Sequence, residues 1–507
     1  MTGFSEYDRY DGLGLAELVR KGEVTPAELV DEALARIDRV NPTLNAVVTR
    51  FDALARGQAM SSAQEGPFAG VPLLLKDLLA HLAGTPLSSG TALRKGVLST
   101  FDSEIVKRFR RAGFVFLAKT NTPEFGIQPV TEPALWGPSR NPYDPSRTCG
   151  GSSGASAAAV AAGIVPVATG GDGGGSIRIP ASCCGVFGLK PTRARTPTGP
   201  TLGEAWQGCA VQHVLTRSVR DSAAVLDAIG GPEPGSIYVA PPPAGPYLDE
   251  VTREPGKLKI AFSSQPVIPV PVAPECVAAV EEAAQLLRDL GHEVVPDQPR
   301  VDGAAFARRF SLMLCGEVAA EVRALEAEVG RTPGASDLEP ATWLLALLGE
   351  QYSAGTFAEA VRQLKVMSHG VAPFFETYDA YLTPTLAQPP IEVGSLLPGG
   401  LEKTLLTLLT RLKAGGTLKT MGALDKLAGS AWRFTPFTTL FNVTGQPGMS
   451  LPLTWSSAGL PLGVQVVGRF GDESTLFRLA GQLERARPWA DRRPQVWSGT
   501  PGQVARA

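Results

Sequence analysis

The sequence predicts an α/β protein with a large mixed, mostly parallel β-sheet that is covered by α-helices on both faces. Two observations predict this class. Short apolar segments alternate with amphipathic helical patterns, and the same alternation recurs in the second half of the chain. Strands that alternate with helices in this way build largely parallel sheets whose faces are covered by the helices.

The first half of the chain begins this alternation. Thr25, Pro26 and Glu28 predict a capping box before the segment LVDEALARIDRV, in which apolar residues recur at helical spacing. An apolar strand is expected at 71–75, and it delivers Lys76 at its carboxyl end, where open α/β sheets place ligands. The next elements expected are a helix at 103–113 and a strand at 114–118.

The second half repeats the unit and then becomes helical. A strand at 258–262, a helix at 276–291 and a strand at 292–295 are expected after a proline-rich surface connection at 232–250. Residues from about 303 to 430 are mostly helical in pattern, and 442–469 predicts a hairpin that returns to the sheet. Helices inserted in an α/β protein often wall or cover a pocket.

Composition excludes several classes of partner. The 507 residues include 47 Lys and Arg against 49 Asp and Glu, a net charge of −2, so the composition shows no electrostatic signature of binding to nucleic acid or anionic lipid. No apolar stretch reaches the ~20 residues that a membrane helix needs. Six cysteines without a C-x-x-C pattern predict a reducing compartment without disulfides, and the acidic, polar start of the chain does not match a secretion signal, so a cytoplasmic protein is expected. The sequence has no H-E-x-x-H pattern and no tight cluster of His, Asp and Glu, so neither a metal nor a cofactor is expected.

The segment GGDGGGSIRIP (170–180) concentrates five glycines before Ser176. Glycine is costly in helices and strands, so such a run indicates either a flexible linker or a tight backbone nest. Apolar segments flank the run on both sides, which favours the nest. The run contains neither a P-loop nor a dinucleotide-binding pattern, so phosphate binding is not expected.

The residues alone leave open which group would act as the base that activates Ser176. Only four histidines occur in the chain, and none is close to Ser176 in sequence. Gly150, Ser152 and Gly154 match the G-x-S-x-G pattern of a nucleophile elbow, but the preceding NPYDPSRTC predicts a loop rather than the required strand. Lys76 is the best placed alternative, although a lysine that ends an apolar strand can also extend to solvent.

Residues 149–192, CGGSSGASAAAVAAGIVPVATGGDGGGSIRIPASCCGVFGLKPT, resemble the signature segment of the amidase signature family of serine amidohydrolases. Further similar segments, at 66–79, 118–126 and 441–469, extend the resemblance over nearly the whole chain. The resemblance implies the amidase signature fold as a single domain over 1–507. Its expected parts are an N-terminal helical region at about 1–65, the signature core at about 66–235, a helical insert at about 303–430 that walls the pocket, and a return to the sheet at about 431–490.

The resemblance also implies a Ser-Ser-Lys catalytic triad. Ser176 corresponds to the nucleophile that forms the acyl-enzyme, Ser152 to the bridging serine after a cis peptide bond, and Lys76 to the base; Ser153 is a second candidate for the bridge. The backbone amides of Gly173, Gly174 and Gly175, together with that of Ser176, correspond to the oxyanion hole. Glycines leave main-chain donors room to converge on one carbonyl oxygen.

Two further features follow from the same comparison. The family commonly has threonines where this chain has Gly171 and Gly173, which predicts a looser turn and a different pocket shape. Asp172 and Arg178 are expected to form a structural ion pair. A free lysine has a pKa of ~10.4, so Lys76 must be desolvated before it can accept a proton at neutral pH.

Within the family, TNTPEFGIQPVTEPALWGPSRNPYDPSR (120–147) and Cys315 resemble 6-aminohexanoate cyclic-dimer hydrolases. This predicts a small-molecule amide substrate, cyclic or linear aminohexanoate-type or aryl, with Asn121 and Cys315 at the substrate; Cys315 can equally be a small buried apolar residue. The alternatives are a glutaminase-type A subunit of a tRNA-dependent amidotransferase and a Ser/His esterase of α/β-hydrolase type. A homodimer is possible.

Overall fold

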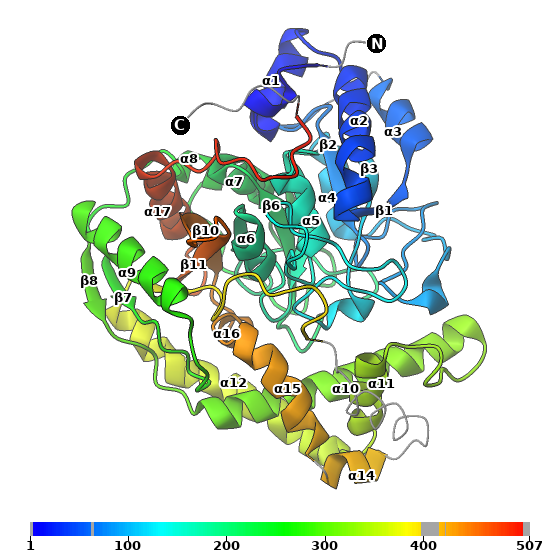
Figure 1. Cartoon of the computed structure of the whole chain (residues 1–507), viewed down its shortest axis with the longest axis vertical. Coiled ribbons are helices and arrows are strands. Elements are labelled where there is room, and N and C mark those ends of the chain that lie inside the picture. Colours follow the sequence, from blue (N-terminus) through cyan, green and yellow to red (C-terminus); the bar gives the residue numbers. More distant parts are fainter. Residues whose placement is uncertain (1–3, 62–64, 397–414, 421, 500–507) are drawn as a thin grey trace.

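A mixed eleven-stranded β-sheet lies at the centre of the computed structural model (Figure 1), which describes residues 4–61, 65–396, 415–420 and 422–499. The strands lie in the order β1 (Val47–Arg50), β3 (Val115–Thr120), β2 (Pro72–Lys76), β4 (Val167–Asp172), β6 (Val211–Thr216), β5 (Phe187–Lys190), β10 (Gly448–Trp455), β11 (Pro461–Gly468), β9 (Ala380–Pro384), β7 (Lys259–Phe262) and β8 (Glu293–Pro296).

Helices cover both faces of this sheet. Every residue of β2, β3, β6, β9 and β11 is buried, which requires cover on the two faces of each strand. The helices are α1 (Gly12–Lys21), α2 (Pro26–Leu44), α3 (Asp52–Ala59), α4 (Glu104–Arg111), α5 (Gly154–Ala161), α6 (Arg178–Cys184), α7 (Val219–Ile229), α8 (Tyr247–Glu250), α9 (Pro274–Asp289), α10 (Gly303–Val329), α11 (Pro340–Gly349), α12 (Ala354–Thr377), α14 (Gly415–Thr420), α15 (Ala423–Phe434), α16 (Leu440–Thr444) and α17 (Glu473–Ala486). The predicted α/β class is therefore confirmed.

The expectation that the sheet is mostly parallel is wrong. Among the strands of the described residues, four pairs are parallel (β2–β3, β2–β4, β7–β9 and β7–β8) and six are antiparallel (β1–β3, β4–β6, β5–β6, β5–β10, β10–β11 and β9–β11). A parallel pair needs a crossover, whereas a hairpin joins antiparallel neighbours. Alternating helices and strands identify the class, but they do not determine which strands become neighbours.

Local sequence signals agree with the observed elements where the signals are strong. Thr25 caps α2 through a capping box with Glu28. The apolar run near residue 71 is β2, with Lys76 as its last residue. The expected C-terminal hairpin is the antiparallel pair β10–β11.

The segment expected to be a helical insert also contains a strand. β9 lies between α12 and the later helices, and it pairs with β11 and β7 inside the sheet. Its five residues are all buried, so they lack the apolar and polar alternation that marks a half-exposed strand. Helices α10, α11, α12, α14 and α15 lie together at the bottom of Figure 1, and residues 397–414 and 421 of the expected insert lie outside the described residues.

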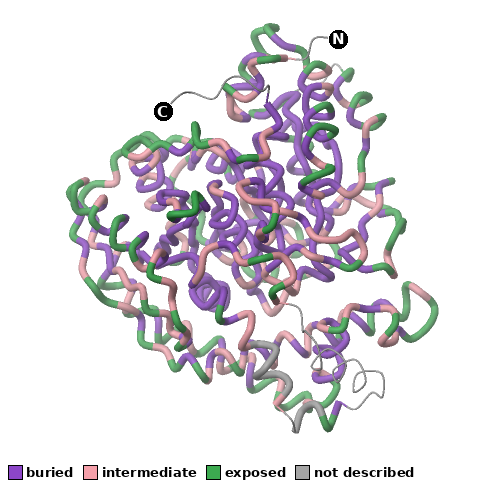
Figure 2. Tube along the Cα trace, in the orientation of Figure 1, coloured by how far each residue is buried: buried purple, intermediate pink, exposed green. Residues whose placement is uncertain are grey.

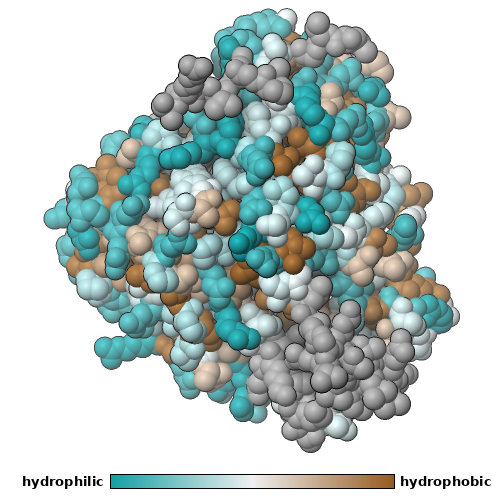
Figure 3. Space-filling model, viewed as in Figure 1, coloured by the Kyte–Doolittle hydropathy of each residue, from teal (hydrophilic) through white to brown (hydrophobic). Residues whose placement is uncertain are grey.

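Burial concentrates around the sheet and the helices beside it. The Cα trace is buried along α5, α6 and the central strands, and exposed along the outer helices (Figure 2). Hydrophilic and hydrophobic residues are interspersed over the face in Figure 3. None of the described helices is long and apolar enough to cross a membrane.

Candidate active site

Two parallel strands bring Lys76 beside the glycine-rich turn at 173–176, called the acyl turn below. Strand β2 pairs with β4 in parallel, with Leu73 opposite Val167, so the carboxyl ends of both strands meet at one edge of the sheet. Lys76 ends β2, and the acyl turn follows β4 directly. The Lys76 backbone N–H donates to Thr169 Oγ1 of β4 at 2.7 Å, which holds the two strand ends together.

The Lys76 ammonium group is buried and bonded to two serines. Lys76 Nζ donates to Ser152 Oγ at 2.7 Å and to Ser153 Oγ at 3.0 Å. Lys76 and Ser152 are each 2% exposed, and Ser153 is fully buried. The Gly151–Ser152 peptide bond is cis, as the resemblance implied.

Burial shifts the protonation equilibrium of this lysine strongly. Removal from water lowers the pKa of Lys76 from 10.5 to about 7, against the opposing charge of Asp172. No carboxylate forms a salt bridge with Lys76 among the described residues. A substantial fraction of the amine is therefore neutral near pH 7 and can accept a proton.

Ser176 lies at the other side of this cluster. The Ser153 backbone N–H donates to the Ser176 carbonyl oxygen at 3.2 Å, so the two serine segments are in direct contact. Ser176 is 8% exposed, more than Lys76, Ser152 or Ser153. Its hydroxyl makes no hydrogen bond with any other described residue, which leaves the oxygen available to an incoming group.

Three backbone amides of the acyl turn are available to a ligand. The N–H groups of Gly173, Gly174 and Ser176 donate no hydrogen bond within the described part of the chain. The Gly175 N–H instead donates to Asp172 Oδ1 at 2.7 Å. The expectation that Gly175 supplies a free donor is therefore not met, because the carboxylate that shapes the turn already occupies its amide.

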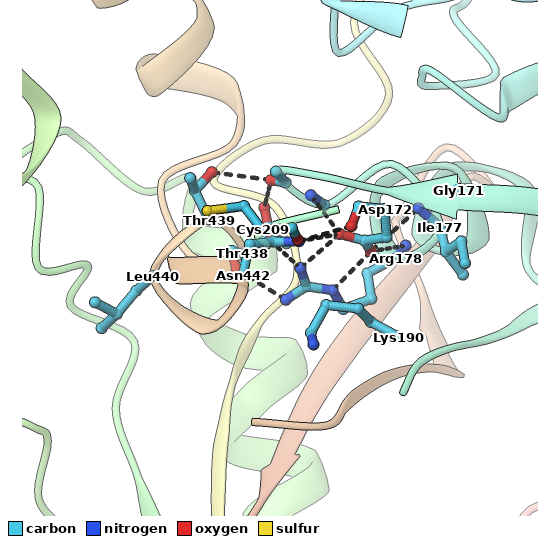
Figure 4. Close-up of polar contacts among 12 residues, drawn as sticks. Gly171, Asp172, Ile177, Arg178, Lys190, Cys209, Thr438, Thr439, Leu440 and Asn442 are labelled. Carbon is cyan, nitrogen blue, oxygen red and sulfur yellow. Dashed lines mark hydrogen bonds and ion pairs between the residues drawn. The ribbon is translucent and has the colours of Figure 1, made fainter. Parts of the chain in front are cut away.

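A buried ion pair shapes the acyl turn (Figure 4). Asp172 accepts from Arg178 Nε at 3.0 Å and Nη2 at 2.9 Å, and both side chains are fully buried. The same carboxylate accepts from the backbone N–H groups of Gly175 and Ile177 and from Asn442 Nδ2. The predicted Asp172–Arg178 pair is confirmed. Burial alone would raise the pKa of Asp172, but the Arg178 charge and the hydrogen bonds lower it to about 2.

Replacing Asp172 by Asn is expected to lower the free energy of unfolding by about 3–5 kcal/mol, because Arg178 would remain as an uncompensated buried charge. Asp337→Asn is the control, since it disrupts the pair with Arg331, which lies at the surface, where ion pairs contribute little to stability. Urea denaturation at pH 7 measures both. The contribution of ionised Asp172 to the free energy of unfolding should be complete above pH ~4 and should be lost as the pH falls through about 2. Equal losses in the two variants would contradict a structural role for the buried pair.

Sequence reasoning missed the residues that arrive from the far end of the chain. Thr438 and Thr439 donate their hydroxyls to the Gly174 carbonyl at 2.6 and 2.9 Å. Arg178 Nη1 donates to Gln465 Oε1 at 2.7 Å, and Arg178 Nη2 to Asn442 Oδ1 at 2.6 Å. These contacts join residues more than 250 positions apart, so no local pattern reveals them. The second serine of GSSG was the one available signal for the Ser153 contact with Lys76.

The two residues expected at the substrate, Asn121 and Cys315, are buried and contact other residues of the protein. Asn121 is fully buried; its Nδ2 donates to the Gly137 carbonyl and to Ser139 Oγ, and its Oδ1 accepts from the Thr122 N–H. These bonds use the side chain to hold a neighbouring loop. Cys315 is fully buried in an apolar cluster of α10 and α11, and burial raises the pKa of its thiol to about 12. Both observations favour structural roles over substrate contact.

A histidine base finds no support in the described contacts. His213 Nε2 bonds to Ser222 Oγ, His81 Nδ1 to Ser99 Oγ, and neither ring bonds to Ser152 or Ser176. Within the described ranges there is also no group of three or more His, Cys, Asp or Glu side chains that could hold a metal ion.

The structure thus brings a buried lysine and two serines together at the carboxyl edge of an α/β sheet, an arrangement that suits a hydrolase with a serine and a base other than histidine. A family model described as Amidase matches residues 28–477. The chain belongs to this amidase signature family, and it is a hydrolase that acts on carbon–nitrogen bonds in amides.

Individual relatives cover almost the entire chain. The 6-aminohexanoate-cyclic-dimer hydrolase of Paenarthrobacter ureafaciens is 40% identical over 493 residues, which are 96% of this chain and 96% of that protein. A solved structure of 6-aminohexanoate cyclic dimer hydrolase complexed with substrate matches with a TM-score of 0.86, 39% identity, and coverage of 96% and 99%. A bacterial aryl acylamidase of the same family matches with a TM-score of 0.81 and 25% identity, over 95% and 97% of the two chains.

Proposed function

We propose that this chain hydrolyses a carboxylic amide through an acyl-enzyme on Ser176, with Ser152 and Lys76 as a proton relay. One observation carries the proposal. The buried Lys76 amine, with its pKa lowered to about 7, is 2.7 Å from the Ser152 hydroxyl at the sheet edge where the acyl turn presents Ser176. This arrangement pairs a serine with a base other than histidine.

In the first step, Ser176 Oγ attacks the carbonyl carbon of the amide. The Ser176 proton passes to Ser152 Oγ as the Ser152 proton passes to the neutral Lys76 amine. The carbonyl oxygen gains negative charge and accepts hydrogen bonds from the N–H groups of Gly173, Gly174 and Ser176. Each well-placed donor of this kind contributes ~3 kcal/mol to the transition state.

In the second step, the carbon–nitrogen bond breaks and the proton returns through Ser152 to the departing amine. The acyl group then remains as an ester on Ser176. Water attacks this ester with the same relay as the base, and the bond to Ser176 Oγ breaks to release the carboxylic acid. Because the Lys76 amine both accepts and donates the proton, its pKa needs to be close to the working pH.

We further propose that the acyl group is a six-carbon, aminohexanoate-type chain in a cyclic or linear amide. The similarity to 6-aminohexanoate cyclic dimer hydrolase over 96% of this chain supports this substrate class. The helical segment also borders the acyl turn. Phe310 of α10 places its Cζ 3.9 Å from the position that a Cβ on Gly174 would occupy, so the space beside the reacting carbonyl is partly apolar.

A substrate panel tests this proposal. Purified enzyme is assayed for hydrolysis of the cyclic and linear dimers of 6-aminohexanoate, hexanamide, acetamide, acetanilide, glutamine and the ester ethyl hexanoate. The readout is the amino group, ammonia or acid that each substrate gives. We expect kcat/KM for the six-carbon amides to exceed that for acetamide at least ~10-fold, because each buried methylene group contributes ~1 kcal/mol or more. Preference for glutamine, with co-purifying subunits on size-exclusion chromatography, would instead support an amidotransferase A subunit, and turnover of esters alone would support an esterase.

A further inference from the structure

A short loop with left-handed backbone lies beside the acyl turn. Three consecutive residues have positive φ: Trp206 (50°), Gln207 (54°) and Gly208 (79°). Bulky residues rarely adopt this conformation, and where they do, the surrounding structure holds them, often at functional sites. The loop directly precedes β6, whose Val211 pairs with Asp172 of β4, so the register brings the loop to the first residue of the acyl turn.

Contacts on both sides hold this loop in place. Gln207 Nε2 donates to Glu317 Oε1 of α10 at 2.8 Å. Asn442 Nδ2 donates to the Cys209 carbonyl at 3.1 Å and also to Asp172 Oδ1 at 2.8 Å. The loop therefore shares a hydrogen-bonding residue with the ion pair that shapes the acyl turn.

The Trp206 ring fills the space that a side chain at position 173 would need. A Cβ built on Gly173 would lie 2.7 Å from Trp206 Cε3, which is closer than real Cβ contacts, and 3.0 Å from Cζ3. Gly173 has no left-handed φ, unlike Gly175, so its backbone would accept a side chain. The ring of Trp206, rather than the backbone conformation, excludes any larger residue at 173.

The same ring belongs to an apolar wall. Trp206 is half-buried and packs against an aromatic cluster that includes Phe310 and Trp432. Phe310 approaches Gly174 from α10, so aromatic rings lie beside two successive residues of the acyl turn. The Gly173 and Gly174 N–H groups are both free within the described residues.

We infer that Trp206 is a positioning and selectivity residue: its ring packs against Gly173, fixes the direction of the Gly173 N–H, and forms an apolar wall for the acyl chain. This inference rests on the proposed function and adds to it. Amides with an unbranched apolar chain next to the carbonyl would gain contact with this wall, whereas acetamide would not.

A double-mutant cycle tests the coupling. Gly173→Ala, Trp206→Ala, Trp206→Phe and the double variant Gly173→Ala/Trp206→Ala are assayed on hexanamide and acetamide. Gly173→Ala is expected to lower kcat about 100-fold, since the new methyl group displaces a donor. Trp206→Ala should lower kcat about 10-fold and reduce the preference for hexanamide by a similar factor. The double variant should recover at least ~10-fold over Gly173→Ala, because the methyl group then has space. Trp206→Phe should lie between wild type and Trp206→Ala.

Trp497→Ala is the matched control. Trp497 is also half-buried and packed against a glycine, Gly163. Gly163 precedes β4, so this contact lies at the end of that strand opposite the acyl turn. This variant should lower the melting temperature without changing kcat or the preference between the two amides. If the Gly173 and Trp206 effects simply multiply while Ser176→Ala is inactive, the inference about Trp206 is wrong. If Ser176→Ala retains turnover, the proposed function fails and the inference fails with it.

Discussion

Ser176→Ala is expected to lower kcat on hexanamide by about 10⁵-fold or more. The substitution removes the atom that would carry the acyl group, and loss of a nucleophile that acts with its base as a unit costs about as much as loss of the whole set. The amides of Gly173 and Gly174 remain, so a small residual rate above that in water should persist. Initial rates of ammonia release measure the loss, and intact-mass spectrometry after brief exposure to hexanamide should detect an acyl adduct only in the wild type.

Ser182→Ala is the matched control for this substitution. Ser182 is a buried serine on α6, the helix that follows the acyl turn, and its hydroxyl accepts from the Gly463 N–H at 2.9 Å. Its removal should reduce stability by about 1–3 kcal/mol without changing kcat. A Ser176→Ala variant that keeps turnover within tenfold of the wild type would show that another group attacks the amide.

Sequence patterns predicted those parts of the candidate site that depend on residues adjacent in the chain. Lys76 was found because an apolar strand ends there, and the acyl turn because glycines cluster before Ser176. The availability of each amide was not predictable. Gly175 is occupied because Asp172, three residues earlier, turns its carboxylate back onto that N–H, and a sequence pattern does not contain side-chain direction.

The missed features depend on contacts between distant segments. Strand β9 is buried on both faces and therefore has no alternation of apolar and polar residues. For this reason the sequence pattern predicts a helical region where β9 lies. The expectation of a mostly parallel sheet is wrong because the direction of strand pairing depends on which strands become neighbours. The local order of helices and strands does not determine those neighbours. Thr438 contacts the Gly174 carbonyl, and Asn442 contacts Asp172, from a segment more than 260 residues later in the chain.

Lys76→Met is expected to lower activity strongly without lowering stability. The variant keeps an unbranched side chain that is one atom shorter and removes the amine, so kcat/KM should fall about 10²–10⁴-fold, the usual contribution of a general base. Stability at pH 6 should not fall, because the wild type must hold a partly protonated, desolvated amine there and the thioether carries no such penalty. Rates of hexanamide cleavage and thermal unfolding of the same preparation measure the two effects.

The pH dependence separates a base from a merely buried cation. With a pKa of about 7, Lys76 is protonated below that pH, so log kcat/KM of the wild type should rise by one unit per pH unit up to about 7 and level off above it. Lys119→Met is the control: Lys119 is fully buried on the adjacent strand β3, its pKa is lowered to about 8 by burial, and its Nζ donates to the Ala80 carbonyl. That variant should keep the wild-type profile, whereas Lys76→Met should lose the rise near pH 7. A profile in Lys76→Met that still rises through pH 7 would assign the titration, and the role of base, to a different group.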